Sequence, residues 1–351
     1  MKLTKPAAIL LLILAATVAY WNSFDVPFVF DDMVSVQRNY GVRTGYFNWN
    51  PLDGRWVLYL TFTLNSMLSG QDVWGYHLIN LLLHILNGIA VFLIAEHLLG
   101  GVNPAALAAA VFLLHPVQTE SVVYVSSRSE LLSTAFYLAG FLLFLKSRAP
   151  GILLALGVGI CLFLGIGSKE TAITLPAVIL AYDWIFNGKP WQRWRFYLPF
   201  VIAVPLGIYH IFTMIRPSLG GTAWHYFLTQ TRVLVQYLGI IAWPAHLNLE
   251  HDVAPSTEFD SAVLGSLALL SLILLGGWLA RRPFPILTFS VFWFFITLAP
   301  TSSFFPIADL MFEHRLYLPM AGVVLSVPLL MDAVSAGFER LRTNYAYLWS
   351  S

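Results

Sequence analysis

Two adjacent carboxylates, Asp31 and Asp32, follow the first apolar segment in the stretch FVFDDMVSVQRN. Ionisable side chains at a membrane edge are costly, so they are candidates for function. A carboxylate near an apolar boundary can act as a general base towards a hydroxyl group. A solvated helix end is the simpler alternative, but the surrounding residues are aromatic and unlike an ordinary loop. We therefore favour Asp31 as a base, supported by Asp32.

Further polar clusters lie at the ends of other apolar segments. In GSKETAITLP, Lys169 suits phosphate binding as a compact point charge, although it could simply pair with Glu170. In EHRLYLP, Arg315 offers a planar fork that can hold a phosphate with two bonds. In HPVQTESVVYVSSRSELL, Glu120 and Arg128 could bind a ligand or could pair with each other across the turn.

The elements that must position these residues are membrane helices. Of 351 residues, 58% are hydrophobic and only 11% are charged, whereas soluble domains carry about 25% charged residues. Apolar windows of about 17–25 residues mark transmembrane helices. We predict an all-α polytopic membrane protein with one domain over 1–351 and ten spans: 6–22, 74–98, 104–122, 127–145, 150–167, 171–187, 196–215, 261–280, 284–300 and 316–333.

Two long stretches, 23–73 and 216–260, separate spans on the predicted outer side, and we expect interfacial helices in both. The second contains Arg232 within TRVLVQYLGIIAWPAHLNLEHD, whose polar interruptions suit a helix lying in the membrane interface. An eleventh span near 231–243 is the alternative. It would place Arg281 and Arg282 on the wrong side.

The charges indicate an orientation with both termini inside. Lysine and arginine then divide eleven inside to eight outside, in the direction that the positive-inside rule requires. The acidic residues divide fourteen outside to four inside, although acids contribute little to topology. A working site on the outer face explains this excess. We expect a bacterial inner membrane, cytoplasmic termini and a site that faces the periplasm.

Other chemistries find little support in the sequence. His77, Asn80, His84 and Asn87 recur on one face of the second span, where interhelical contacts are the usual role; His77 is the better site candidate. The histidines and carboxylates show none of the common metal-ligand spacings, so we do not favour a required divalent metal. There is no Gly-rich phosphate loop, nucleotide fingerprint or basic tract for nucleic acid.

Five blocks in sequence order resemble the membrane glycosyltransferases of the GT-C fold. They are FVFDDMVSVQRN, YHLINLLLHILN, HPVQTESVVYVSSRSELLSTAFYL, GSKETAITLPAVILAYDW and EHRLYLP. Together they are most similar to the membrane half of the transmembrane and tetratricopeptide repeat-containing O-mannosyltransferases and their bacterial relatives. The resemblance extends from Asp31 to about Gly322.

The resemblance implies transfer of a mannose or similar hexose from a polyprenyl-phosphate donor to a hydroxyl on the luminal or periplasmic face, with inversion. It implies a catalytic carboxylate at Asp31 or Asp32. The donor phosphate would contact Arg315, Lys169, Arg128 and Arg232. The sugar or acceptor would contact His115, Glu120, Glu170, Glu313, His314 and His77. The acceptor would be a protein or a glycan, and no cofactor is implied because the lipid-linked sugar is a substrate.

The sequence departs from this family in lacking a tetratricopeptide repeat domain, so a partner protein with such repeats could supply acceptor recognition. Two other functions stay open. A transporter or flippase for a polar lipid or solute would need ionisable residues near the bilayer midplane and related halves. A non-catalytic member of the fold would tolerate loss of both aspartates.

Overall fold

The computed structural model describes residues 3–47, 50, 54–147, 151–188, 190–214, 222–307 and 309–336. Over these residues the protein is helical, without strands. The predicted cytoplasmic C-terminus, 337–351, lies outside the described residues. The α-helices are α1 (Lys5–Ala19), α2 (Tyr40–Thr44), α3 (Trp56–Ser69), α4 (Val73–Leu99), α5 (Val102–Leu114), α6 (Thr119–Val123), α7 (Arg128–Lys146), α8 (Ile152–Ile166), α9 (Leu175–Tyr182), α10 (Trp194–Met214), α11 (Ala223–Ala242), α12 (Ser261–Leu279), α13 (Pro285–Leu298) and α14 (Tyr317–Val323).

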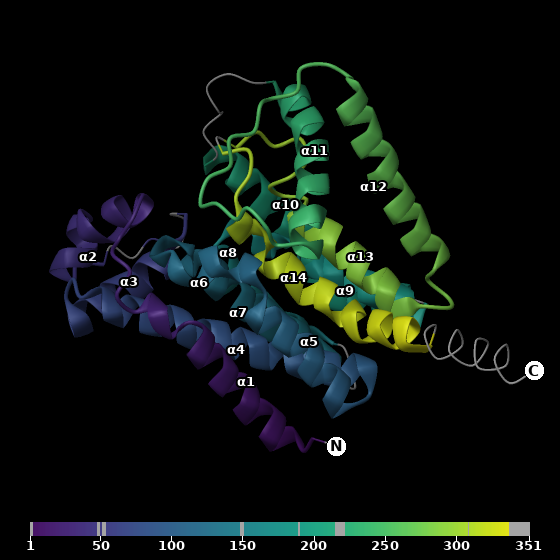
Figure 1. Cartoon of the computed structure of the whole chain (residues 1–351), viewed down its shortest axis with the longest axis horizontal. Helices are drawn as coiled ribbons and strands as arrows, with labels where there is room; N and C mark the ends of the chain where they lie inside the picture. The colour runs from purple at the N-terminus through teal and green to yellow at the C-terminus, as the bar shows by residue number, and fades with distance from the viewer. Residues whose placement is uncertain are drawn as a thin grey trace, which may run out of the picture.

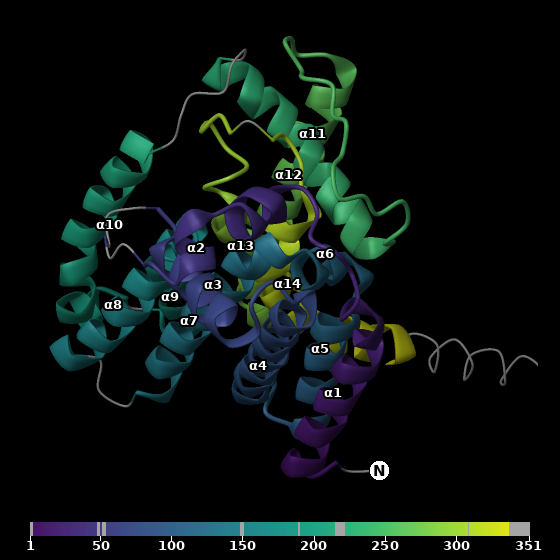
Figure 2. The same cartoon turned by 90° about the vertical axis from the view of Figure 1, so that its left-hand side faces the viewer.

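The helices form one bundle around α4, which packs against α1, α5 and α7. Figure 1 shows α1 beside α4 at the lower edge and the α11–α12 hairpin standing above α13. In Figure 2, α8 and α10 cover the side of the bundle away from α1. The short α2 and α3 both come from the first predicted outer stretch, and α11 comes from the second.

Helix length and hydropathy support a polytopic membrane protein but not all ten predicted spans. Among the described residues, five helices are long and apolar enough to cross a membrane, or six if α5 and the following turn to Val123, bent by 51°, form one span. The helices α8 and α13 are apolar but have only 15 and 14 residues. At 1.5 Å per residue they reach roughly 22 Å, less than the ~30 Å of a hydrocarbon core. The count of ten stays a prediction.

Two helix breaks between α5 and α7 shape the outer end of the bundle, and the first is at Pro116. Pro116 cannot donate a backbone hydrogen bond, and Val117 N donates to His115 Nδ1 (3.2 Å) instead of continuing the helix. The freed carbonyl of Leu113 is bonded by His84 Nε2 of α4 (3.0 Å).

The second break is at Tyr124, whose ψ of 113° leaves the helical region. In a continuous helix Ser126 N would donate to Val122 O. Here Ser126 N donates to the Asp32 carboxylate (2.7 Å), and Val122 O accepts from Asn80 Nδ2 of α4 (3.2 Å). Side chains from two other elements thus replace the missing helical bond.

The polar stripe of α4 has the interhelical role predicted for it. His77, Asn80, His84 and Asn87 are all buried, each at most 1% exposed. Each bonds a backbone carbonyl outside α4: Val26 O, Val122 O, Leu113 O and Leu131 O, in that order. At the two helix breaks, the α4 helix therefore satisfies Leu113 O and Val122 O, which would otherwise be unpaired in an apolar environment.

We predict that Asn80→Leu destabilises the protein by about 2–4 kcal/mol, because it leaves Val122 O and the Arg128 Nε donor without their partner. The measurement is the unfolding midpoint in detergent. Leu86→Ala, on the exposed face of the same helix, is the control. Equal midpoints for the two variants would contradict this account of the break.

Candidate functional site

The Asp31–Asp32 pair sits on a strained turn that gives the two carboxylates different environments. Phe30 has a φ of 46°, in the left-handed region that non-glycine residues rarely adopt. Asp32 is 1% exposed, and its oxygens accept from Ser126 N (2.7 Å), Ser126 Oγ (2.5 Å) and Val29 N (3.2 Å). Burial raises the pKa of Asp32 above its usual range, against the lowering effect of these bonds.

Asp31 differs from its neighbour in being exposed. Its backbone N donates to the hydroxyl of Tyr124 (3.0 Å), which fixes the main chain while the carboxylate stays accessible. The turn therefore separates a buried, fully bonded carboxylate from an accessible one. This is the division of roles that a base and its support require.

A cavity of about 290 Å³, here called the outer cavity, lies beside this turn. Three parts of the chain meet around it: the first outer stretch, the α6 segment, and the loop after α11 together with the start of the last helical segment. Its lining residues are Val26, Val29, Thr119, Glu120, Val123, Tyr124, Leu247, Asn248, Leu249 and Glu313. Tyr124 both lines the cavity and bonds Asp31, so Asp31 lies at its edge.

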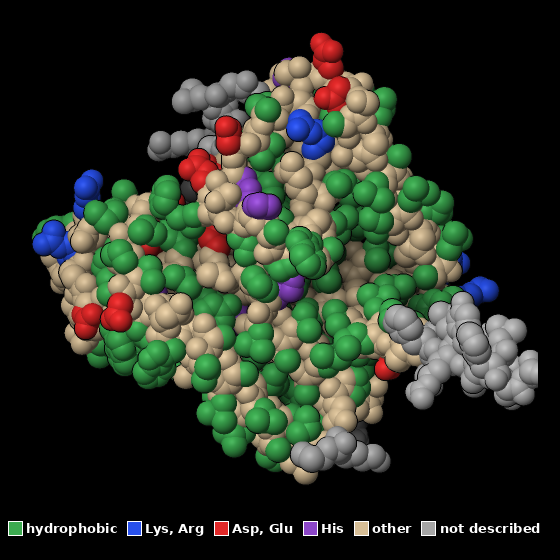
Figure 3. Space-filling model, in the orientation of Figure 1, with side chains coloured by type: hydrophobic (Ala, Val, Ile, Leu, Met, Phe, Trp, Pro, Cys, Tyr) green, Lys and Arg blue, Asp and Glu red, His purple; other side chains and the backbone are tan. Residues whose placement is uncertain are grey.

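Two buried carboxylates line the outer cavity, and each is held by a histidine. Glu120 accepts from His314 Nδ1 (2.5 Å) and from His314 N (2.8 Å). Glu313 Oε1 accepts from Asn248 N (2.7 Å) and contacts His251 Nε2 (2.8 Å). Figure 3 shows acidic and histidine side chains close together above the middle of one face, among hydrophobic ones.

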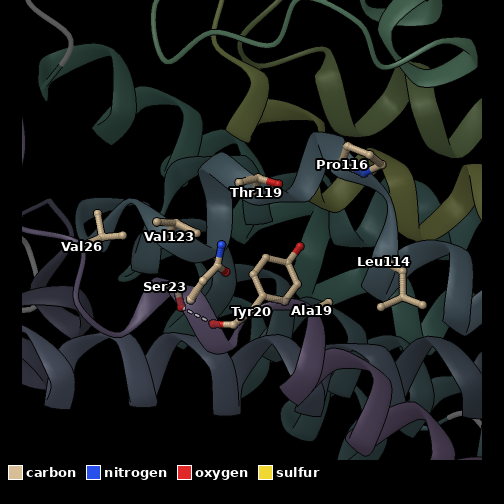
Figure 4. A pocket seen from close by; sticks show the side chains of 9 residues that line it. Ala19, Tyr20, Ser23, Val26, Leu114, Pro116, Thr119 and Val123 are labelled. Atoms are coloured by element: carbon tan, nitrogen blue, oxygen red, sulfur yellow. Dashed lines mark hydrogen bonds between the residues drawn. The ribbon is translucent and has the colours of Figure 1, made fainter.

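A second cavity of about 360 Å³ adjoins the outer cavity and shares Val26, Thr119 and Val123 with it. Figure 4 shows Ala19, Tyr20 and Ser23 on one side of it and Leu114, Pro116, Thr119 and Val123 on the other. We call it the α1 cavity. Most of its lining side chains are apolar, and it lies between the outer end of α1 and the break at Pro116.

A third cavity of about 420 Å³ is lined by residues 250–253 and 309–312. These residues directly follow Leu249 and directly precede Glu313 of the outer cavity. The third cavity is therefore lined by neighbours in the chain of outer-cavity residues, and it has acidic side chains at positions 250, 252 and 309.

The structure buries Arg128 completely, away from the outer cavity. Its guanidinium donates to Asn80 Oδ1 (2.8 Å), Asn65 Oδ1 (2.8 Å) and Tyr76 O (3.0 Å). It also lies 4.8 Å from the centre of the Phe62 ring. Its exposed fraction is 0%, so it has no face open to a donor phosphate in this structure. Its geometry is that of a structural cation.

The other three predicted phosphate-binding cations each have different hydrogen-bond or ion-pair partners. Lys169 is 5% exposed and forms a buried ion pair with Glu130 (2.5 Å). Arg232 donates to Ser256 Oγ (2.8 Å) and Ala254 O (3.3 Å). Arg315 donates to Asp309 O (2.7 Å), next to the third cavity.

His115, His77 and Glu170, which were also predicted to contact the sugar or acceptor, do not line the outer cavity. His115 Nε2 bonds Ile241 O (3.1 Å) while its Nδ1 accepts from Val117 N, so both ring nitrogens are used by the backbone. His77 Nε2 bonds Val26 O (2.8 Å), and its Nδ1 is buried without a partner.

Glu170 lies 3.5 Å from Arg55 rather than pairing with its neighbour Lys169. Burial disfavours the charged form of Glu170, but the positive charges of Arg55 and Lys169 outweigh it and lower its pKa. Like His115 and His77, Glu170 does not line the outer cavity.

Tyr124 and Ser126 are the residues that sequence reasoning did not single out, whereas Asn248 and His251 belong to the polar stretch around Arg232 and were given no role. Tyr124 and Ser126 hold the aspartate pair, and Asn248 and His251 hold Glu313. Tyr124 and Ser126 stand in a motif block, which was the available signal, but the partners of all four residues are 62–94 residues away in the chain. Within the part of the chain that the structure describes, no group of three His, Cys, Asp or Glu side chains could hold a metal ion.

Comparison with known proteins supports the resemblance stated from the motifs. The chain is 31% identical over 195 residues to human protein O-mannosyl-transferase TMTC3, covering 50% of this chain and 21% of that protein. It is 34% identical over 192 residues to protein O-mannosyl-transferase Tmtc2 of Drosophila melanogaster, covering 48% of this chain and 20% of that protein.

A longer match of 23% identity over 368 aligned positions is to protein O-mannosyl-transferase F38B6.6 of Caenorhabditis elegans. It covers 94% of this chain and 52% of that protein, so the chain spans about a fifth to a half of these relatives. No family model and no solved structure matches. The chain is homologous to the membrane part of the TMTC protein O-mannosyl-transferases, a family of polytopic membrane glycosyltransferases.

Proposed function

We propose that this protein is a glycosyltransferase of the GT-C type that moves mannose, or a similar hexose, from a polyprenyl-phosphate donor to a hydroxyl acceptor with inversion. The homology supports a mannosyltransferase role. The observation that carries the mechanism is the Asp31–Asp32 turn at the edge of the outer cavity, with Asp31 exposed and Asp32 bonded to Ser126.

In this mechanism Asp31 removes the proton from the acceptor hydroxyl. The acceptor oxygen forms a bond to the anomeric carbon as the bond from that carbon to the phosphate oxygen breaks. The electron pair of the broken bond leaves with the polyprenyl phosphate. Asp32 takes no part in the transfer. By accepting from Ser126 and Val29 it fixes the turn that presents Asp31.

The negative charge on the leaving phosphate needs a preorganised cation. Arg315 is the best of the four candidates because it lies two residues after the cavity residue Glu313 and its hydrogen bonds are to the uncharged carbonyls of Asp309 and Leu310. Arg232 also bonds uncharged groups, Ala254 O and Ser256 Oγ, but it is further in the chain from any residue that lines the outer cavity. Lys169 already has its charge balanced by Glu130. We therefore assign the phosphate to Arg315 and leave Arg128 a structural role.

We place the site on the outer side of a bacterial inner membrane, in a bundle of about ten spans. The contacts Lys5–Glu96 and Leu3 N–Asn103 tie the start of α1 to the far end of α4 and to α5. The three cavities lie towards the other end of α4, near the break segment. The basic inner ends predicted from the sequence then face the cytoplasm. The shorter α8 and α13 would cross a locally thinned bilayer. The acceptor is a protein or a glycan.

The α1 cavity suits the first isoprene units of the donor. It is largely apolar and shares the lining residues Val26, Thr119 and Val123 with the outer cavity. The phosphate of a lipid-linked donor lies between its chain and its sugar, so a chain beside α1 would place both the phosphate and the sugar in the outer cavity, next to the segment that carries Glu313 and Arg315.

The first test is release of polyprenyl phosphate from a short-chain polyprenyl-phosphate mannose by purified protein, with a mixed peptide and glycan pool as acceptor. Asp31→Asn should lower the transfer rate by about a hundredfold or more, as expected for loss of a general base. The matched control is Asp25→Asn, another exposed aspartate of the same stretch. Equal rates for wild type and Asp31→Asn would remove Asp31 from the chemistry. No transfer by folded protein would favour a transporter or a non-catalytic role.

Activity and stability should depend on pH in opposite directions through Asp32. As pH falls through its raised pKa, Asp32 gains a proton and loses an acceptor site for Ser126 or Val29, so transfer should fall. A carboxyl whose pKa is higher in the folded than in the unfolded state contributes stability at low pH and loses it as pH rises through the folded pKa. The acid loss of activity should therefore occur without unfolding.

The measurement is transfer rate and unfolding midpoint across pH for wild type and Asp32→Asn. The difference in midpoint between the two proteins isolates the contribution of this carboxyl. Asp32→Asn should transfer the sugar more slowly than wild type. Its rate should not show the fall at low pH that protonation of Asp32 causes in wild type. An acid loss of activity that coincides with unfolding would refute this role for Asp32.

Val123→Phe should narrow the junction between the two cavities and raise KM about tenfold for donors with several isoprene units, with little change for a donor carrying a single unit. Val18→Phe, on the exposed face of α1, serves as the control. The measurement is KM for donors of different prenyl-chain length. An equal rise in KM for all lengths would show that the prenyl chain binds elsewhere.

A further inference from the structure

The outer cavity has an unusual charge pattern for a site that would take a phosphorylated donor. Two of its ten lining residues, Glu120 and Glu313, are carboxylates, and none of the ten is lysine or arginine. Glu120 is 8% exposed and Glu313 is 2% exposed. The part of the cavity that the sugar would occupy is therefore lined by buried acceptors.

The two carboxylates are not equivalent towards a ligand. Both oxygens of Glu120 accept from His314. Glu313 uses only Oε1 for its two partners, Asn248 N and His251 Nε2, which leaves Oε2 for the cavity. A sugar hydroxyl that donates to this oxygen would form a charge-assisted hydrogen bond.

The position of Glu313 depends on the loop after α11. Asn248 and His251 lie three residues apart on this loop, and together they fix Oε1 from the side opposite the last helical segment. His251 is partly buried, with 17% of its side chain exposed. It lines the third cavity and not the outer cavity, so it reaches a sugar in the outer cavity through Glu313.

We propose that the outer cavity selects an uncharged sugar and rejects a hexuronic acid, with Glu313 as the specificity-determining residue and His251 as its positioning residue. The inference rests on the proposed function and adds the residues that exclude a charged sugar from its donor site. A hydroxyl donates to Glu313, whereas a sugar carboxylate is acceptor-only and carries the same charge. Juxtaposed like charges disfavour the wrong partner strongly, so such a pair gives specificity.

The test compares two donors with the same short prenyl chain, polyprenyl-phosphate mannose and polyprenyl-phosphate galacturonic acid. Equilibrium binding to the purified full chain in detergent is measured first, and transfer is measured separately. Wild type should bind the mannosyl donor at least tenfold more tightly. Glu313→Gln should reduce the ratio of the two affinities, mannosyl donor over galacturonosyl donor, about tenfold. The amide of glutamine keeps an oxygen for Asn248 and His251 but loses the charge. Glu258→Gln, an exposed carboxylate of the same loop that lines none of the three cavities, should leave the ratio unchanged.

His251 is tested in the same way. His251→Ala should lower the ratio and raise KM for the mannosyl donor with a smaller effect on kcat. His251→Gln, whose amide can donate near the position of Nε2, should restore most of both. A lower unfolding midpoint with an unchanged ratio would show a merely structural role and refute the positioning claim.

Three results would overturn the proposal: equal binding of the two donors by wild type, an unchanged ratio in Glu313→Gln, or binding of neither donor. Selective binding that depends on Glu313, without transfer to any acceptor, would instead refute the proposed transferase activity and leave the sugar site standing. The binding and transfer measurements therefore separate the two failures.

Discussion

The replacement of a helical hydrogen bond at Tyr124 is the interaction on which the outer end of the structure depends. Where the helix breaks, Ser126 N turns to Asp32 and Val122 O is taken by Asn80. Asn80 also accepts from Arg128. The carboxylate of Asp32 therefore bonds one side of the break, and Asn80, which carries the guanidinium of Arg128, bonds the other. Unpaired backbone groups are expensive in an apolar environment, which makes these polar side chains necessary and not incidental.

This constraint explains why two aspartates stand together. Asp32 is needed to complete the break, and in doing so it draws the first outer stretch against α6. Its neighbour Asp31 is then carried to Tyr124, at the edge of the outer cavity. The left-handed Phe30 is consistent with this account, because strained backbone persists where surrounding contacts determine it. A structural bond thus positions the residue proposed for chemistry.

The sequence was sufficient for the helical membrane class and the inward stripe of α4, because each depends on local composition or on helical spacing. It could not predict which charged side chains are buried. Arg128 resembles a phosphate ligand by type and place, but it is buried with partners Asn65 and Asn80, which come from α3 and α4. The number of spans depends on helix length as well as on composition, since α8 and α13 are apolar but short and Pro116 stands at a bend of 51°.

The same long-range contacts decide how the site is built. Glu120 and Glu313 are far apart in sequence, yet each is held by a histidine, and the second histidine comes from the loop after α11. The first outer stretch, α6, that loop and the last helical segment therefore meet around one cavity, where apolar side chains stand beside these polar contacts. Apolar side chains line part of the cavity, and hydrogen bonds hold its polar side chains in place. A lipid chain can therefore lie against the apolar side chains while the polar side chains orient a polar group. A donor that is itself half lipid and half sugar phosphate matches that division.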